Sequence, residues 1–144
     1  MAAPQATVLQ NGRRKAYRPI PAADRRAAFE AAVEAYDRGD FFEAHELLEP
    51  AWMGTDDVGE RELYQGLIKL AAAFVHGVRG NPRGIAKNLE GARARLGTAL
   101  AAGTPTGGID LAALLADIDG RLSRLAADAD DRTLTAPILR RRAR

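Results

Sequence analysis

Two helical segments between Gly39 and Arg79 constrain the fold of this chain more than any other feature of its sequence. They contain both histidines, the only tryptophan and three of the four phenylalanines. A break rich in Gly, Thr and Asp, from Gly54 to Gly59, separates them. Apolar residues recur in each segment at spacings of three and four, which is typical of amphipathic helices. We therefore expect two antiparallel helices that pack together with their polar rows turned inward.

Capping residues and helix breakers predict where the helices begin and end. A first helix is expected from Pro21–Asp24 to Gly39, because glycine suits the left-handed position that follows a helix. Asp40 is a favourable N-cap for the second helix, and Pro50 should kink that helix or end it near Trp52. Three more helices are expected over residues 57–79, 81–100 and 110–125, the last two with Asn81 and Asp110 as N-caps.

The expected fold class is all-α, with about five helices packed as antiparallel hairpins. Helix-forming residues outnumber β-branched ones, and 144 residues suffice for one domain with a core. Gly39 and Gly80, 41 residues apart, each end one helix just before a capping residue, which partly resembles tetratricopeptide repeats. We expect the helix over 57–79 to be central, because Gly66 and Ala71–Ala73 allow close helix approach.

The expected organisation is a single domain over residues 21–128, between a flexible arm (1–20) and a basic tail (129–144). The arm has no periodic apolar pattern, and it lacks the apolar core of a secretory signal. No apolar run reaches the roughly 20 residues that cross a bilayer, so we expect a cytoplasmic protein. Net charge is +2, a small imbalance between many arginines and many acidic residues, which argues against nucleic acid as a partner. The absence of cysteine excludes disulfides and thiolate chemistry.

Polar residues on both helices of the organising stretch form the candidate site. His45 and Glu49 are four residues apart, and Trp52 continues the same face of the helix before the break. In the helix after the break, Gln65, Lys69 and His76 lie on one face over three turns. Antiparallel packing would bring the two rows together inside an otherwise apolar interface. The expected site residues, with two neighbours included, are His45, Glu46, Glu49, Trp52, Tyr64, Gln65, Lys69 and His76.

This arrangement has three interpretations. Buried polar groups need partners, so the two rows can form a purely structural network. Alternatively they line a small-ligand pocket, in which Gln65 and Glu49 orient the ligand while Trp52 and Tyr64 form walls. We expect a non-enzymatic binding or interaction domain with a polar pocket between the two helices. A scaffold that presents helix faces to another protein is a further possibility, and the sequence identifies neither the ligand nor the partner.

The third interpretation is a metal site, in a metal-binding protein or a metal-dependent hydrolase. His45 and Glu49 can reach one ion from adjacent turns of a helix, and His76 would supply a third ligand. The His-Glu-x-x-Glu pattern lacks the second histidine of the zinc-protease helix. The sequence leaves open whether the chain is an enzyme, and it indicates no particular cofactor.

The pattern of these residues resembles the family called domain of unknown function 309, over roughly residues 25 to 100. The motifs that carry the resemblance are Phe42–Glu49 with Trp52, then Tyr64–Ala71, and finally His76 with Gly80–Ala86. The resemblance implies a small all-helical protein and no established activity. One departure is Lys69, where many members have glutamine. The signature positions that it implies are His45, Glu46, Glu49, Trp52, Gln65 and His76.

Overall fold

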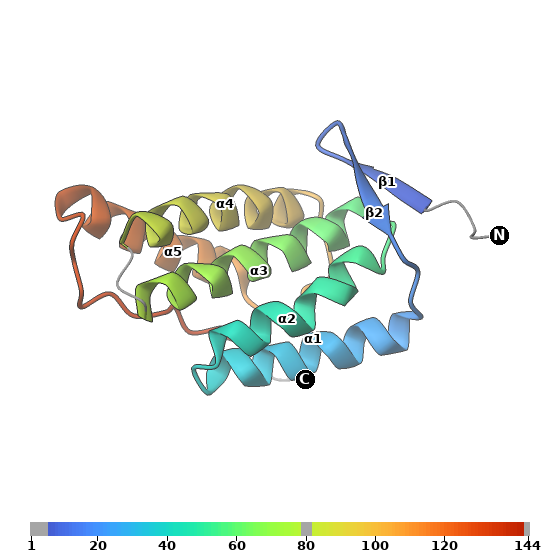
Figure 1. The fold of residues 1–144 in the computed structure, drawn as a ribbon, viewed down its shortest axis with the longest axis horizontal. Coiled ribbons are helices and arrows are strands. Elements are labelled where there is room, and N and C mark those ends of the chain that lie inside the picture. Colours follow the sequence, from blue (N-terminus) through green and yellow to red (C-terminus); the bar gives the residue numbers. More distant parts are fainter. Residues whose placement is uncertain (1–5, 79–81, 143–144) are drawn as a thin grey trace.

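The computed structural model describes residues 6–78 and 82–142. Within these residues the chain forms a two-stranded hairpin followed by five helices, with neighbouring helices antiparallel (Figure 1). No helix in the described part is long and apolar enough to span a membrane. The elements are β1 (Ala6–Gln10), β2 (Arg13–Tyr17), α1 (Ala22–Asp37), α2 (Phe41–Met53), α3 (Val58–Val78), α4 (Pro82–Ala101) and α5 (Leu111–Ala127).

The predicted caps are confirmed where the structure describes them. Gly39 follows α1 with a φ of 83°, a left-handed conformation that glycine adopts without strain. Asp40 and Asp110 are the N-caps of α2 and α5, and each side chain accepts a hydrogen bond from the backbone N–H three residues on. Pro50 lies inside α2, which ends three residues later. Asn81, the predicted cap of α4, lies outside the described residues.

The core is centred on α3, which packs against both α2 and α4. Gly66 permits the close approach of α4, because a Cβ atom there would lie 2.7 Å from the side chain of buried Leu96. The expected central position of this helix is therefore confirmed, whereas the partial likeness to tetratricopeptide repeats stays a prediction. The buried stripe that α3 contributes to the core consists of Leu63, Leu67, Leu70 and Phe74.

The predicted tail does contain the basic residues, but residues 134–142 of it pack against the helices. The backbone pairs Ile109 with Arg141, and the Arg141 guanidinium binds the Glu30 carboxylate at 2.6 and 2.8 Å. Tyr36 donates a hydrogen bond to the carbonyl of Pro137, and Leu139 is buried beside α1. The segment has no helical period, so its apolar residues gave no signal of packing.

The predicted flexible arm is also corrected, because residues 6–17 form an antiparallel hairpin. Its pairs run from Ala6 with Tyr17 to Gln10 with Arg13. The turn residues Asn11 and Gly12 both have positive φ, 55° and 74°, as a tight hairpin turn requires. An isolated hairpin is marginally stable, so its order depends on docking to the helices where α2 ends and α3 begins (Figure 1).

Candidate functional site

The polar row between α2 and α3 is closed by a residue of the hairpin. The Gln10 side chain is buried, and its Nε2 donates to Gln65 Oε1 at 2.7 Å and to Glu62 Oε1 at 3.1 Å. Its Oε1 accepts hydrogen bonds from Trp52 Nε1 and from Arg61 Nε, both at 3.2 Å. Trp52 and Gln65, which were predicted to face a ligand, are therefore joined through the chain's own glutamine.

Arg61 holds the loop between α2 and α3 against this network. Its side chain is fully buried, and its Nη1 donates to the carbonyls of Trp52 and Thr55, each at 3.0 Å. The guanidinium carbon lies 5.1 Å from the centre of the Trp52 ring, within cation–π range. Burial lowers the pKa of Arg61, because desolvation disfavours the charged form. The Arg61 charge is thus stabilised by backbone dipoles, a glutamine and an aromatic face.

Glu62 connects the same network to α4. Its carboxylate is buried, accepts from Gln10, and pairs with Arg95 Nη1 at 3.2 Å. A buried carboxylate needs such partners, since an unpaired one is strongly disfavoured. The hairpin, α3 and α4 are therefore linked by one continuous set of polar contacts.

The structure brings three of the predicted site residues together on α2. Possible ligand atoms of His45, Glu46 and Glu49 all lie within 4.8 Å of one another. His45 Nδ1 lies 3.3 Å from Glu46 Oε1, and it makes no hydrogen bond within the described part of the chain. Within the same described residues, no hydrogen bond or ion pair joins Glu49 to Gln65 or Lys69, so the expected pairing of the rows occurs only near Trp52. The side chain of His76 lies outside the described residues, although α3 includes its backbone.

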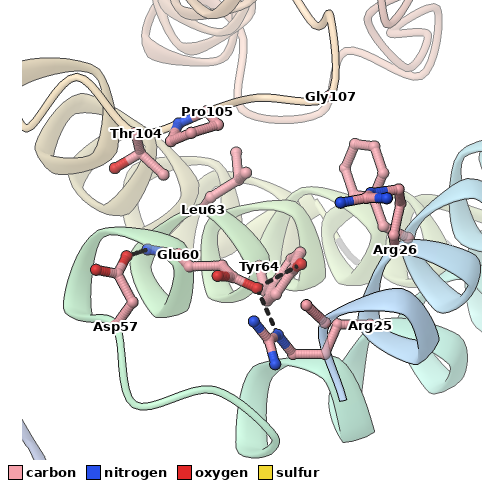
Figure 2. A pocket seen from close by; sticks show the side chains of 11 residues that line it. Arg25, Arg26, Asp57, Glu60, Leu63, Tyr64, Thr104, Pro105 and Gly107 are labelled. Atoms are coloured by element: carbon pink, nitrogen blue, oxygen red, sulfur yellow. Dashed lines mark hydrogen bonds and ion pairs between the residues drawn. The ribbon is translucent and has the colours of Figure 1, made fainter. Parts of the chain in front are cut away.

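Tyr64 belongs to a different pocket, between α1, α3 and the loop that precedes α5. Arg25 and Tyr64 both point toward Glu60 (Figure 2). Arg25 Nε and the Tyr64 hydroxyl donate to Glu60 Oε1 at 2.7 and 2.8 Å. Burial, and then the hydrogen bond to Glu60, raise the pKa of the Tyr64 hydroxyl. The pocket has a volume of about 290 Å³, but its Arg25 and Glu60 charges neutralise each other. Tyr64 therefore does not form a wall with Trp52.

Lys69 lines an open cavity next to the closed network. This α3–α4 pocket has a volume of about 480 Å³ and is bounded by α3, α4 and the hairpin turn. Burial, and then the charges of Arg95, Lys87 and Lys15, lower the pKa of Lys69. The pocket is lined by Asn11, Glu62, Lys69, Lys87, Asn88, Gly91, Ala94, Arg95 and Thr98.

A comparison with protein families identifies a family that part of this chain matches. Residues 29–88 match the family described as Domain of unknown function (DUF309). This chain carries a DUF309 domain. The match confirms the resemblance that the sequence motifs indicate, and its description assigns no function. No curated protein and no solved structure matches the chain.

Sequence reasoning missed two residues outside the DUF309 domain and two inside it. Gln10 and Arg95 lie beyond residues 29–88, and both contact Glu62 inside the domain. The dipeptide Asn11–Gly12 between two five-residue segments was an available hairpin signal. Arg61 and Glu62 look like solvent-facing positions of a helix, and no local pattern shows that a hairpin covers them.

Proposed function

We propose that this protein is a non-enzymatic binding domain whose ligand occupies the α3–α4 pocket. The observation that carries the proposal is the contrast between two neighbouring polar regions. Gln10 fills the row between α2 and α3, whereas the adjoining cavity of about 480 Å³ is open. Ligand sites are concave and hold a few convergent polar groups, and this cavity receives them from three elements.

The arrangement supports binding rather than catalysis by general acid–base chemistry. Glu62, the carboxylate that lines the pocket, is buried and held by Gln10 and Arg95. Both carboxylate oxygens of Glu62 already accept hydrogen bonds from Gln10 or Arg95, so neither is positioned to take a proton from a ligand. Lys69 and the two asparagines of the lining offer donors that orient a ligand without reacting with it.

A pocket-filling variant tests the proposed site. Ala94 is exposed on α4 and lines the cavity, so Ala94→Phe should obstruct the cavity without disturbing the core. The control is Ala101→Phe, at an exposed position of α4 outside the pocket. In a thermal-shift screen of metabolites, we expect at least one compound to raise the Tm of the wild type and the control by about 2 °C or more. The same compound should leave Ala94→Phe unchanged.

Two results of this screen would refute the proposed site. One is the absence of any compound that raises the Tm of the wild type. The other is a compound that raises the Tm of all three proteins equally, because its site would then lie elsewhere.

The group formed by His45, Glu46 and Glu49 supports a second candidate function, which is metal binding. An imidazole and two carboxylates from adjacent turns suit a divalent transition metal and leave positions for water, as in a metal-dependent hydrolase. His45 Nδ1 lacks a hydrogen-bond partner among the described residues, as a ligand atom awaiting an ion would. In this candidate Glu46 takes the place for which the sequence suggested His76.

Zinc titration of untagged protein tests this second candidate. If it is correct, calorimetry should show one Zn²⁺ per chain, and His45→Ala and Glu49→Gln should each weaken binding by about 10-fold or more. Glu43→Gln is a matched control, because Glu43 lies on the same helix and binds Arg38 instead. Equal zinc affinity of wild type and His45→Ala would eliminate the candidate.

A further inference from the structure

The α3–α4 pocket has a strong excess of positive charge. Lys69 extends across α4 at Gly91, where an added Cβ would lie 2.7 Å from Lys69 Cδ and 3.6 Å from its Nζ. Lys87 and Arg95 occupy the same face of α4, one turn before and one turn after Gly91. The Lys69 ammonium is therefore held between two other cations, and the absence of a side chain at position 91 makes this placement possible.

The two lysines of the pocket differ from Arg95, which pairs with Glu62. Within residues 6–78 and 82–142, neither Lys69 nor Lys87 forms an ion pair. Glu62 is the one acidic residue of the lining, and its contacts are Gln10 and Arg95. Burial, and then the charges of Arg95, Lys87 and Lys15, lower the pKa of Lys69. The fold thus keeps mutually repelling cations around an open cavity.

We propose that the α3–α4 pocket binds the phosphate groups of a small molecule, with a diphosphate or two adjacent phosphates as the recognised unit. This proposal rests on the proposed function and names the chemical class of its ligand. Three cations line the pocket against one carboxylate, and Arg95 pairs with that carboxylate. The two lysines therefore leave an excess of positive charge, which a ligand with several negative charges matches better than a single carboxylate does. Lysine ammonium groups bind phosphate oxygens as point charges, and asparagine amides add neutral donors.

The shape of the site favours a small molecule over nucleic acid. Nucleic-acid-binding proteins spread their cations along a face or a helix, so that they follow a phosphate backbone. Here Lys69, Lys87 and Arg95 converge on one cavity of about 480 Å³, closed at one side by Asn11 of the hairpin turn. The expected ligand places its phosphates at Lys69 and extends toward the open side of the cavity.

Calorimetric titration with inorganic pyrophosphate at low salt tests the proposal. Lys69→Gln and Lys87→Gln should each weaken binding by about 10-fold or more, because each removes a charge-assisted contact. Arg132→Gln removes the same charge at an exposed position outside the pocket and should leave the affinity within about 2-fold, since salt screens distant exposed charges. Lys87 is exposed, so its variant is expected to fold even if substitution of Lys69 alters packing.

Further arms of this titration separate the alternatives. Citrate of similar charge should bind more weakly than pyrophosphate, and so should an oligonucleotide without terminal phosphates. Tighter binding of citrate would overturn the phosphate assignment, and tighter binding of the oligonucleotide would overturn the small-molecule assignment. An equal loss of affinity in Arg132→Gln and Lys87→Gln would show general electrostatic attraction, and it would overturn the proposal that this pocket is the phosphate site. If pyrophosphate fails to bind but a neutral metabolite does so in a manner blocked by Ala94→Phe, this inference falls and the proposed function stands.

Discussion

Replacing Arg61 by methionine is expected to lower the free energy of unfolding by about 3–5 kcal/mol, because each buried acceptor left without its donor costs about 1–3 kcal/mol and several are affected. The guanidinium is fully buried and donates to Gln10 and to the carbonyls of Trp52 and Thr55. Methionine can fill much of the volume but donates no hydrogen bond, so these acceptors would lose their partners. Urea unfolding followed by circular dichroism measures the change.

The matched control for this prediction is Arg93→Met on α4. Arg93 is exposed, and its contact with Asp119 at 3.3 Å is a surface ion pair, which contributes about 0–1 kcal/mol. The two substitutions are chemically identical, so their difference isolates the effect of the buried site. If Arg61→Met destabilises the protein no more than Arg93→Met does, the buried network does not hold the α2–α3 loop.

Replacing Gln10 by alanine is expected to destabilise the protein by about 2–3 kcal/mol, because one buried side chain satisfies several polar partners at once. Truncation removes the Gln10 amide, which is the hydrogen-bond partner of the Trp52 Nε1 donor and of the Gln65 Oε1 acceptor. Water would have to enter to replace the lost contacts, and the hairpin would lose its main attachment to α3. Because Trp52 is the only tryptophan, its fluorescence should shift to longer wavelength as it becomes hydrated.

Leu9→Ala provides the control on the same strand. Leu9 is 62% exposed and points away from the helices, so its truncation should change stability by less than about 0.5 kcal/mol. Chemical unfolding and the emission maximum of Trp52 should therefore distinguish the two variants. Similar stability losses and unchanged emission in both would mean that Gln10 is not the anchor of the hairpin.

The helices were predictable from sequence because their signals are local. Asp40 and Asp110 cap their helices through contacts three residues away, and the stripe from Leu63 to Phe74 repeats with the helical period. Gly66 also indicated that α3 would be approached closely, because a small residue inside a stripe of large ones leaves room for a neighbouring helix. These features depend on spacing alone and require no knowledge of distant segments.

The candidate site was only partly predictable, because its decisive contacts join segments far apart in sequence. Trp52 and Gln65 were recognised as polar residues that face inward, but their common partner is Gln10, 42 and 55 residues away. The strand that carries Gln10 presents this polar residue inward, so it lacks the clean alternation of a strand with an apolar face. Lys69 was recognised, whereas nothing in the sequence placed it in one cavity with Lys87 and Arg95 of α4.

One measurement tests the central claim directly, namely that Gln10 closes the α2–α3 row and that the ligand enters the α3–α4 pocket. The side-chain amides of Gln10, Asn11 and Asn88 can be followed together in a proton–nitrogen correlation spectrum during a pyrophosphate titration. We expect the Gln10 amide protons to exchange slowly and to keep their shifts, while those of Asn11 and Asn88 move to saturation. Fast exchange at Gln10 in the free protein, or unmoved Asn11 and Asn88 signals with excess pyrophosphate, would contradict the account.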